Sequence, residues 1–286
     1  MMKEIYLAAG CFWGTQAYFK KIEGVIKTTV GYANGLTEHT DYEHIFETDH
    51  AETLKIIYDE SKISLKKLLL YYFRVIDPTS INKQGNDVGR QYRTGIYYVD
   101  KEDLALINEV INEMKQKYGL IAVEVKELKN FIKAEEYHQD YLDKHPSAYC
   151  HIDLNLANLD DLSYRVMKEN YTEFPNSSEL NTEFRKGIYV DKLTKVPLFS
   201  SSEKFDAGCG WPSFRKPIVT DAVEYLKDNS YGMDRIEVRS SSGNNHLGHV
   251  FDESQGLRYC INGASLEFIP YEEMEKRGYK EYMKFV

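Results

Sequence analysis

The sequence predicts an α+β protein with two domains, and three observations lead to this class. The chain has 286 residues, which is enough for two hydrophobic cores because domains usually have about 100–150 residues. The first half alternates strand-like and helix-like hydrophobic patterns, whereas the second half consists of short β-like runs separated by turn residues. No sequence repeat relates the two halves.

The first half predicts two successive β-α-β units. We expect helices after residue 14 and over 64–76 and 102–118, and strands near residues 4–8, 25–32, 52–58, 94–99 and 121–126. Ser64 is an N-cap residue type at the start of the second helix, and Gly119 ends the third. This order is typical of a ferredoxin-like α/β sandwich. A long irregular segment, 77–92, interrupts it, and loops of that length are often functional.

The second half predicts a mainly antiparallel β sandwich or barrel with only two short helices. Its strands are expected at residues 187–190, 197–200, 235–240, 249–251, 257–262 and 265–270. Residues 151–163 have the composition of a connector. We therefore expect domains at residues 1–150 and 164–286, joined by the linker 151–163.

Composition and charge argue against several partners. The net charge of −9 disfavours nucleic acid and anionic membranes, because both require basic patches. The longest apolar run, 68–73, is too short to span a bilayer. The N-terminal residues show charge and strand-like alternation in place of a secretory signal, so we expect a cytoplasmic location.

The four cysteines are Cys11, Cys150, Cys209 and Cys260. In a cytoplasmic protein such residues are more often catalytic, redox-sensing or metal-binding than structural. Four cysteines allow three pairings, which the sequence alone leaves open. No Cys-x-x-C motif occurs, so neither a thioredoxin-type motif nor a cysteine zinc site is supported.

Cys11 lies in the segment Gly-Cys-Phe-Trp-Gly, where a predicted strand becomes a predicted helix. A helix N-terminus favours the nucleophilic thiolate, and flanking glycines let a ligand approach the backbone. Phe12 and Trp13 would form the apolar wall of a pocket. The alternative is an inert buried cysteine, since free cysteine is among the most buried residue types. The flanking glycines and the strand-to-helix position favour a reactive Cys11 over an inert one.

This segment and three others resemble peptide methionine sulfoxide reductase of the A type, over about residues 1–152. The other three are Asp-His-Ala-Glu at 49–52, residues 84–93 and residues 136–142. The resemblance implies that Cys11 attacks the sulfoxide sulfur. It also implies that the substrate methyl group lies against Phe12 and Trp13, and that the sulfoxide oxygen is surrounded by Tyr42, Glu52, Asp87 and Tyr92.

Sulfoxide chemistry agrees with these roles. The oxygen leaves readily only when it is protonated, and a carboxylic acid in an aromatic-walled cavity has a raised pKa, so Glu52 would be a proton donor near neutrality. Taken alone, Glu52 would be interpreted as a solvated residue. Attack leaves Cys11 as a sulfenic acid, which a second thiol converts to a disulfide. The resemblance places that resolving thiol at Cys150, although family tails are usually glycine-rich and this one has no glycine.

Three segments of the second half resemble the B-type methionine sulfoxide reductase, over about residues 164–270. They are residues 208–214, 246–251 and 258–268. The resemblance implies that Cys260 is the nucleophile, Cys209 the resolving thiol and Trp211 the contact for the substrate methyl group.

The same resemblance assigns the sulfoxide oxygen and its proton to His246, His249 and Asn262. An imidazolium can donate a proton near pH 7. An isolated His-x-x-His would otherwise be interpreted as a structural pair. A metal site at these histidines is not favoured, because no further ligands occur at suitable spacing. The acidic residue expected in the loop that follows is either Asp252 or Glu253.

Many B-type enzymes carry two Cys-x-x-Cys pairs that bind structural zinc. No cysteine occupies the matching positions, which are Asp191, Thr194, Ser240 and Gly243. We therefore expect no metal cofactor and a domain stabilised by packing.

Together the two resemblances imply a fused enzyme that repairs oxidised protein or reduces free methionine sulfoxide. The N-terminal half would take the S epimer and the C-terminal half the R epimer, because one enzyme serves each sulfoxide epimer. A thioredoxin-like reductant or another dithiol would recycle the oxidised cysteines. Two alternatives are a non-catalytic module whose cysteines sense redox state, and a chain with one active and one degenerate half.

Overall fold

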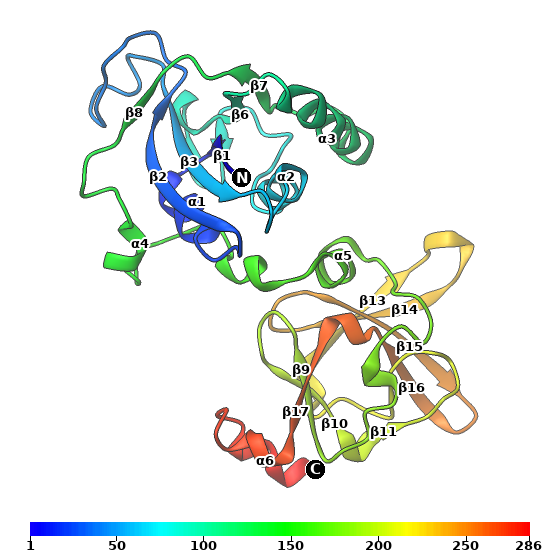
Figure 1. Cartoon of the computed structure of the whole chain (residues 1–286). Helices are drawn as coiled ribbons and strands as arrows, with labels where there is room; N and C mark the ends of the chain where they lie inside the picture. Colours follow the sequence, from blue (N-terminus) through cyan, green and yellow to red (C-terminus); the bar gives the residue numbers. More distant parts are fainter. The chain divides into compact units, whose positions relative to one another are not determined.

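The computed structural model describes all of residues 1–286, and the chain divides into two compact units (Figure 1). The first unit is Met1–Ala157 and the second is Asn158–Val286. No helix combines the length and the apolar character needed to cross a bilayer.

The first unit is built on a curled mixed sheet of six strands in the order β7-β6-β1-β3-β2-β8. Neighbouring strands are antiparallel except β6 and β7, which are parallel. The strands are β1 (Met2–Ala9), β2 (Val25–Ala33), β3 (Ala51–Asp59), β6 (Thr94–Tyr98), β7 (Glu124–Glu127) and β8 (Phe131–Lys133). The two predicted β-α-β units are present, and β8 is an additional strand.

The helices of this unit are α1 (Phe12–Phe19), α2 (Leu65–Phe73), α3 (Asp103–Tyr118) and α4 (Tyr141–Lys144). Helix α1 packs on β2 and β3, and α2 packs on α3. The Ser64 hydroxyl accepts the Lys67 N–H at 3.2 Å, so the predicted N-cap is confirmed. Gly119, at φ 79°, follows α3 as expected. The irregular segment contains β4 (Lys83–Gln84), β5 (Asp87–Val88) and a 3₁₀ turn at Arg90–Tyr92.

The second unit contains two antiparallel sheets, ordered β10-β9-β17 and β11-β12-β16-β15-β14-β13. Their strands are β9 (Gly187–Asp191), β10 (Pro197–Ser200), β11 (Lys204–Phe205), β12 (Ser213–Phe214), β13 (Val223–Asp228), β14 (Arg235–Ser240), β15 (His246–Glu253), β16 (Gly256–Ile261) and β17 (Leu266–Pro270). The helices are α5 (Asp161–Glu169) and α6 (Tyr271–Met274). The antiparallel β class and the two short helices agree with the prediction, while β11, β12 and β13 were not expected.

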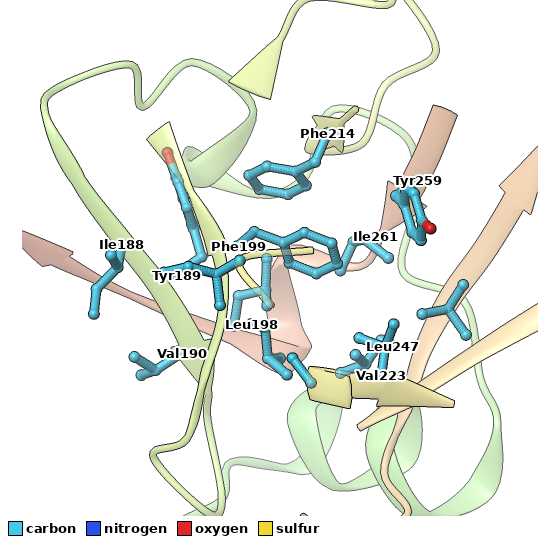
Figure 2. Packing of buried hydrophobic residues seen from close by; sticks show 14 of the residues in the cluster. Ile188, Tyr189, Val190, Leu198, Phe199, Phe214, Val223, Leu247, Tyr259 and Ile261 are labelled. Atoms are coloured by element: carbon cyan, nitrogen blue, oxygen red, sulfur yellow. The ribbon is translucent and has the colours of Figure 1, made fainter. Parts of the chain in front are cut away.

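Apolar residues from both sheets form one core in this unit (Figure 2). The rings of Phe199 and Phe214 are stacked with centroids 4.4 Å apart, which joins β10 of the small sheet to β12 of the large one. Val223 and Leu247 are also buried there. This packing holds the strands that carry Cys260 and the two histidines.

The segment 151–163, expected to be a connector, has regular structure. It contains a 3₁₀ turn at Leu154–Asn158 and the first residues of α5. The Asp160 carboxylate accepts the Ser163 N–H at 2.8 Å and caps α5. Short-range capping by an aspartate therefore orders a stretch whose composition resembles a linker.

Candidate functional sites

Cys11 is the residue at which β1 ends and α1 begins, as predicted. The backbone N–H groups of Trp13 and Gly14 hydrogen-bond to its sulfur and lower the pKa of the thiol. Burial and the charge of Glu52 have the larger effect and raise that pKa well above its ordinary value. The expectation that the helix N-terminus makes Cys11 a resting thiolate is therefore wrong, because desolvation outweighs the helix.

Glu52 projects from β3 and its side chain is fully buried at 2 % exposure. One carboxyl oxygen accepts the Phe12 N–H at 2.9 Å, which fixes it beside Cys11. Burial raises the pKa of Glu52 to about 8, and Asp87 adds a smaller effect in the same direction. The carboxyl group is thus protonated at neutral pH and can act as a proton donor.

An aromatic wall stands next to this pair. The Trp13 ring stacks on Tyr141 at a centroid distance of 3.7 Å, and its Nε1–H donates to His138 Nδ1 at 3.0 Å. The His138 ring also lies 5.2 Å from Phe12 and 4.6 Å from Tyr42. His138 thus contacts three of the aromatic side chains. The sequence did not indicate a role for His138, although it lies in the segment 136–142.

Two tyrosines complete the surroundings of the carboxyl group. Tyr42 and Tyr92 are hydrogen-bonded to each other through their side chains. Burial, with the charge of Glu52, raises the pKa of both phenols. Asp87, half-exposed at the start of β5, is close enough to affect the pKa of Glu52 and of Cys11. The structure therefore brings together Cys11 and the four residues expected around the sulfoxide oxygen.

The segment that carries Cys150 lies against the same site. A Cβ built on Gly14 would be 2.6 Å from the Cys150 sulfur and 3.2 Å from Ile152. Glycine at position 14 therefore leaves room for the thiol over the first turn of α1. Cys150 is seated there without a glycine-rich tail.

Polar contacts hold the residues on either side of Cys150. The Asn86 side chain donates to the Tyr149 hydroxyl at 3.0 Å, and His151 Nδ1 lies 3.6 Å from an Asp87 carboxylate oxygen. Burial lowers the pKa of His151. The segment 149–152 is therefore docked on the 85–88 region rather than left free.

The two cysteines of the second unit lie side by side, with their sulfur atoms 3.6 Å apart. Burial, followed by the interaction with Cys209, raises the pKa of Cys260 to about 12. For Cys209 burial also raises the pKa, but the interactions with the Ser213 hydroxyl, 3.4 Å from the sulfur, and with the Trp211 backbone outweigh it and the pKa is lowered. The lower pKa of the pair therefore belongs to Cys209 and not to the expected nucleophile.

Cys260 opens onto a small cavity of about 110 Å³. Its lining consists of Thr172, Trp211, Arg235, Gly248, His249, Phe251, Cys260 and Asn262. The Trp211 Nε1–H donates to the Glu173 carbonyl at 3.2 Å, which orients the ring. The predicted nucleophile, the predicted methyl contact and two of the three predicted oxygen contacts therefore share one pocket.

The two predicted histidines are neighbours, with ring centroids 5.7 Å apart. His246 Nδ1 lies 2.5 Å from a Glu237 carboxylate oxygen, and His249 Nε2 lies 2.7 Å from Asp228. Burial lowers the pKa of His249 and outweighs the effect of Asp228. His246 lines a separate cavity of about 500 Å³ that His249 also borders.

Sequence reasoning missed the acidic residues that support this site. The carboxylate on His249 comes from Asp228 at the end of β13, while Glu253 pairs with Arg258 at 2.7 Å. Buried Glu173 accepts the Gly263 and Ala264 N–H groups at 2.6 and 2.8 Å. No local signal marks either residue, because both act on segments distant in sequence.

Asn262 is buried and acts partly as a structural link. Its side-chain oxygen accepts the Glu173 N–H at 3.0 Å, and its amide donates to the Leu247 carbonyl at 2.9 Å. These contacts fix Asn262 at the edge of the cavity.

The positions that match the zinc ligands of other B-type enzymes form a hydrogen-bonded cluster. Buried Asp191 accepts from the Leu193 and Thr194 N–H groups at 2.8 Å and from the Asn245 amide at 2.9 Å. Thr194 and Ser242 share a hydroxyl hydrogen bond of 2.7 Å. Both carboxylate oxygens of Asp191 are used, and no thiolate is present, so these residues do not fit a tetrahedral zinc site.

Two family models match the chain. Residues 3–171 match the model described as peptide methionine sulfoxide reductase, and residues 159–270 match the SelR domain. Among solved structures, reduced Mxr1 of Saccharomyces cerevisiae is 39 % identical with a TM-score of 0.50, over 52 % of this chain and 88 % of that one. Methionine sulfoxide reductase A of Corynebacterium diphtheriae is 31 % identical with a TM-score of 0.51, over 52 % and 78 % of the two chains.

These matches agree with both sites. The first model spans the unit with Cys11, Glu52 and the aromatic wall, and the second spans the paired cysteines. The chain therefore belongs to the peptide methionine sulfoxide reductase family and joins an A-type reductase to a B-type, SelR reductase.

Proposed function

We propose that the two units reduce the two epimers of methionine sulfoxide at independent thiol sites, the S epimer in the first unit and the R epimer in the second. The observation that carries the proposal is the protonated Glu52 carboxyl group, hydrogen-bonded beside the Cys11 thiol within an aromatic wall. This arrangement supplies a nucleophile, a proton donor and an apolar surface for a methyl group.

In the first unit the Cys11 sulfur attacks the sulfoxide sulfur while the oxygen receives a hydrogen bond from Glu52. The thiol and the sulfoxide become a cysteine sulfenic acid and methionine, so Cys11 is oxidised and the substrate reduced by two electrons. Tyr42, Tyr92 and Asp87 bind the oxygen, and Phe12 and Trp13 hold the methyl group. The raised pKa of Cys11 means that the thiol proton leaves during the attack, and it ends on the oxygen of the sulfenic acid.

The Cys150 thiol then attacks the sulfenic sulfur, and a disulfide and water form. The docked position of Cys150 over Gly14 supports this step. In the second unit Cys260 takes the role of Cys11 and Cys209 the role of Cys150. There His246, His249 and Asn262 handle the oxygen and its proton, and Trp211 holds the methyl group.

A dithiol reductant of the thioredoxin type returns each disulfide to two thiols by exchange. Repair of oxidised protein fits this chemistry, and free methionine sulfoxide is a second substrate class. We infer that neither site needs a metal, because every reacting group named is a cysteine or a proton donor.

The test is turnover of each purified epimer with dithiothreitol as reductant. We expect Cys11→Ser to abolish reduction of the S epimer only, and Cys260→Ser to abolish reduction of the R epimer only. Loss of both activities in either variant, or no product from wild type, would refute the proposal. An unchanged melting temperature in both variants excludes unfolding as the cause.

A further inference from the structure

The two sulfur atoms of the second site open onto different cavities. Cys260 lines the cavity of about 110 Å³ that also contains Trp211 and Asn262, and Cys209 is not part of that lining. Cys209 lines another hollow, of about 630 Å³, which Cys260 does not border. We call it the Cys209 hollow, and its lining is Phe205, Asp206, Ala207, Cys209, Arg215, Glu253, Ser254, Gln255 and Arg258.

We propose that the Cys209 hollow is the docking surface for a protein dithiol reductant, separate from the substrate cavity, and that Arg215 is a specificity-determining contact for that reductant. The inference rests on the proposed function of the second site. It adds where the reductant binds and which side chain selects it.

The character of the hollow favours a protein over a small molecule. Small-molecule sites are mostly apolar, whereas here only Phe205 and Ala207 are apolar. The Arg215 guanidinium covers the Phe205 ring at 3.7 Å. Transient redox encounters use small, polar, charged surfaces, and the hollow has that character.

Arg215 is the cation of the Cys209 hollow that has no acidic partner. Arg258 is paired with Glu253 at 2.7 Å, and its guanidinium lies over Phe251. Asp206 accepts the Gly208 N–H at 2.8 Å. Arg215 forms no ion pair within 4.0 Å. Asp206 also has no cation within 4.0 Å, so an acidic group on an incoming reductant would pair with Arg215 and a basic group with Asp206, in the same hollow as Cys209.

The exchange step balances with Cys209 as the attacked sulfur. A reductant thiolate bonds to Cys209, the Cys209–Cys260 bond breaks, and its electron pair goes to Cys260, which takes up a proton. The second thiol of the reductant then displaces Cys209 and leaves with its own disulfide. Arg258 favours the departing thiolate because its charge acts on both sulfurs.

The first test traps the mixed disulfide in the full-length Cys11→Ser/Cys150→Ser variant, oxidised once with the R epimer. A thioredoxin that lacks its second cysteine is added, and the linked peptides are mapped by mass spectrometry. We expect the link at Cys209. A link at Cys260 would overturn the inference.

The second test reverses the charge of the hollow. Arg215→Glu should raise the KM for thioredoxin about tenfold in R-epimer reduction, because a rim charge controls encounter. The activity with dithiothreitol and the yield of methionine in a single turnover without reductant should stay unchanged. The matched control is Lys276→Glu, an exposed cation after α6, which should leave the KM for thioredoxin as in wild type.

The outcomes separate the inference from the proposed function. If no methionine forms in the single turnover of wild type, the proposed function fails. If methionine forms but Arg215→Glu and Lys276→Glu behave alike, only the docking surface is wrong. A change of KM for glutathione but not for thioredoxin would assign the hollow to a small anionic thiol and would also overturn it.

Discussion

At the scale of single residues, the protonation state of Glu52 decides whether the first site has a proton donor. Its pKa of about 8 lies above the ordinary value of 4.5 because the carboxyl group is buried. The carboxyl group is therefore protonated at pH 7 and ionises as the pH rises through about 8.

We expect Glu52→Gln to lower kcat/KM for the S epimer at pH 7 by about a hundredfold or more, the usual contribution of a general acid. In wild type this activity should fall as pH rises through about 8, and the variant should lack that fall. The R-epimer activity serves as the internal control. An S-epimer profile identical to wild type would remove Glu52 from the mechanism.

The titration of Glu52 should also change the stability of the first unit, which can be measured independently of activity. The fold favours the neutral carboxyl group, so its stabilisation is complete below pH 4.5 and is lost as pH rises through about 8. Glu52→Gln stays neutral. Its free energy of unfolding should therefore change less than that of wild type across this range, measured by urea denaturation.

We expect formation of the Cys11–Cys150 disulfide to depend on Gly14. A methyl group at this position would lie 2.6 Å from the Cys150 sulfur, which is too close for the thiol to remain in its present position. We expect Gly14→Ala to slow disulfide formation at least about tenfold, while helix propensity itself would favour alanine by about 1 kcal/mol. Rapid quench would follow methionine and thiols separately.

The comparison of the two steps makes this prediction specific. Methionine formation in the first turnover should be unchanged, because Cys11 still reaches the substrate. Ile152→Ala in the Gly14→Ala background should recover part of the rate, since Ile152 is the other contact at 3.2 Å. Equal slowing of both steps would contradict a role confined to Cys150.

At the scale of elements, local patterns predicted the helices better than the strands. Ser64 and Gly119 mark the ends of helices through capping, which depends on neighbours in sequence. Strand β8 was missed because it is set by pairing with the distant strand β2. Strand β13 pairs with the next strand, β14, but most of its residues are exposed, so no alternation of apolar and polar residues marks it. The contact between Asp228 and His249 depends on β13 and was missed with it.

The hydrogen bonds of Asp191 join the end of β9 to the β14–β15 connection. Its carboxylate is fully buried and receives three hydrogen bonds. We expect Asp191→Ala to lower the free energy of unfolding by about 2 kcal/mol or more, because buried partners lose their acceptor.

Chelation provides the complementary measurement. Incubation with a strong zinc chelator should leave the melting temperature of the wild-type chain unchanged, since hydrogen bonds and not metal bonds form this link. A drop in melting temperature that added zinc restores would show that the second unit does hold a metal.

At the scale of the whole molecule, the sequence resemblance named residues that lie together in the structure, except that His246 borders a different cavity from Cys260. It did not predict their electrostatics. Cys11 and Glu52 are brought together by β3 and the start of α1, as the motifs imply. Burial, however, is a property of the complete unit, so the raised pKa of Cys11 could not be derived from the helix N-terminus alone. The same holds for Cys209, whose lowered pKa depends on Ser213 and Trp211.

The division of the chain leads to the last prediction, which concerns disulfide pairing. Cys150 lies over Gly14 in the first unit, and the sulfurs of Cys209 and Cys260 are 3.6 Å apart in the second. Each proposed nucleophile therefore has its proposed resolving thiol within its own unit. After one turnover without reductant, the S epimer should yield only the Cys11–Cys150 disulfide and the R epimer only Cys209–Cys260.

Mass mapping under non-reducing conditions checks the pairing, and Cys150→Ser is the informative variant. In that variant the S epimer should leave Cys11 as a sulfenic acid that a sulfenic-specific reagent labels, with about one methionine formed per chain. If Cys11 instead became linked to Cys209 or Cys260, electrons would pass between the units, and the two sites would not be independent.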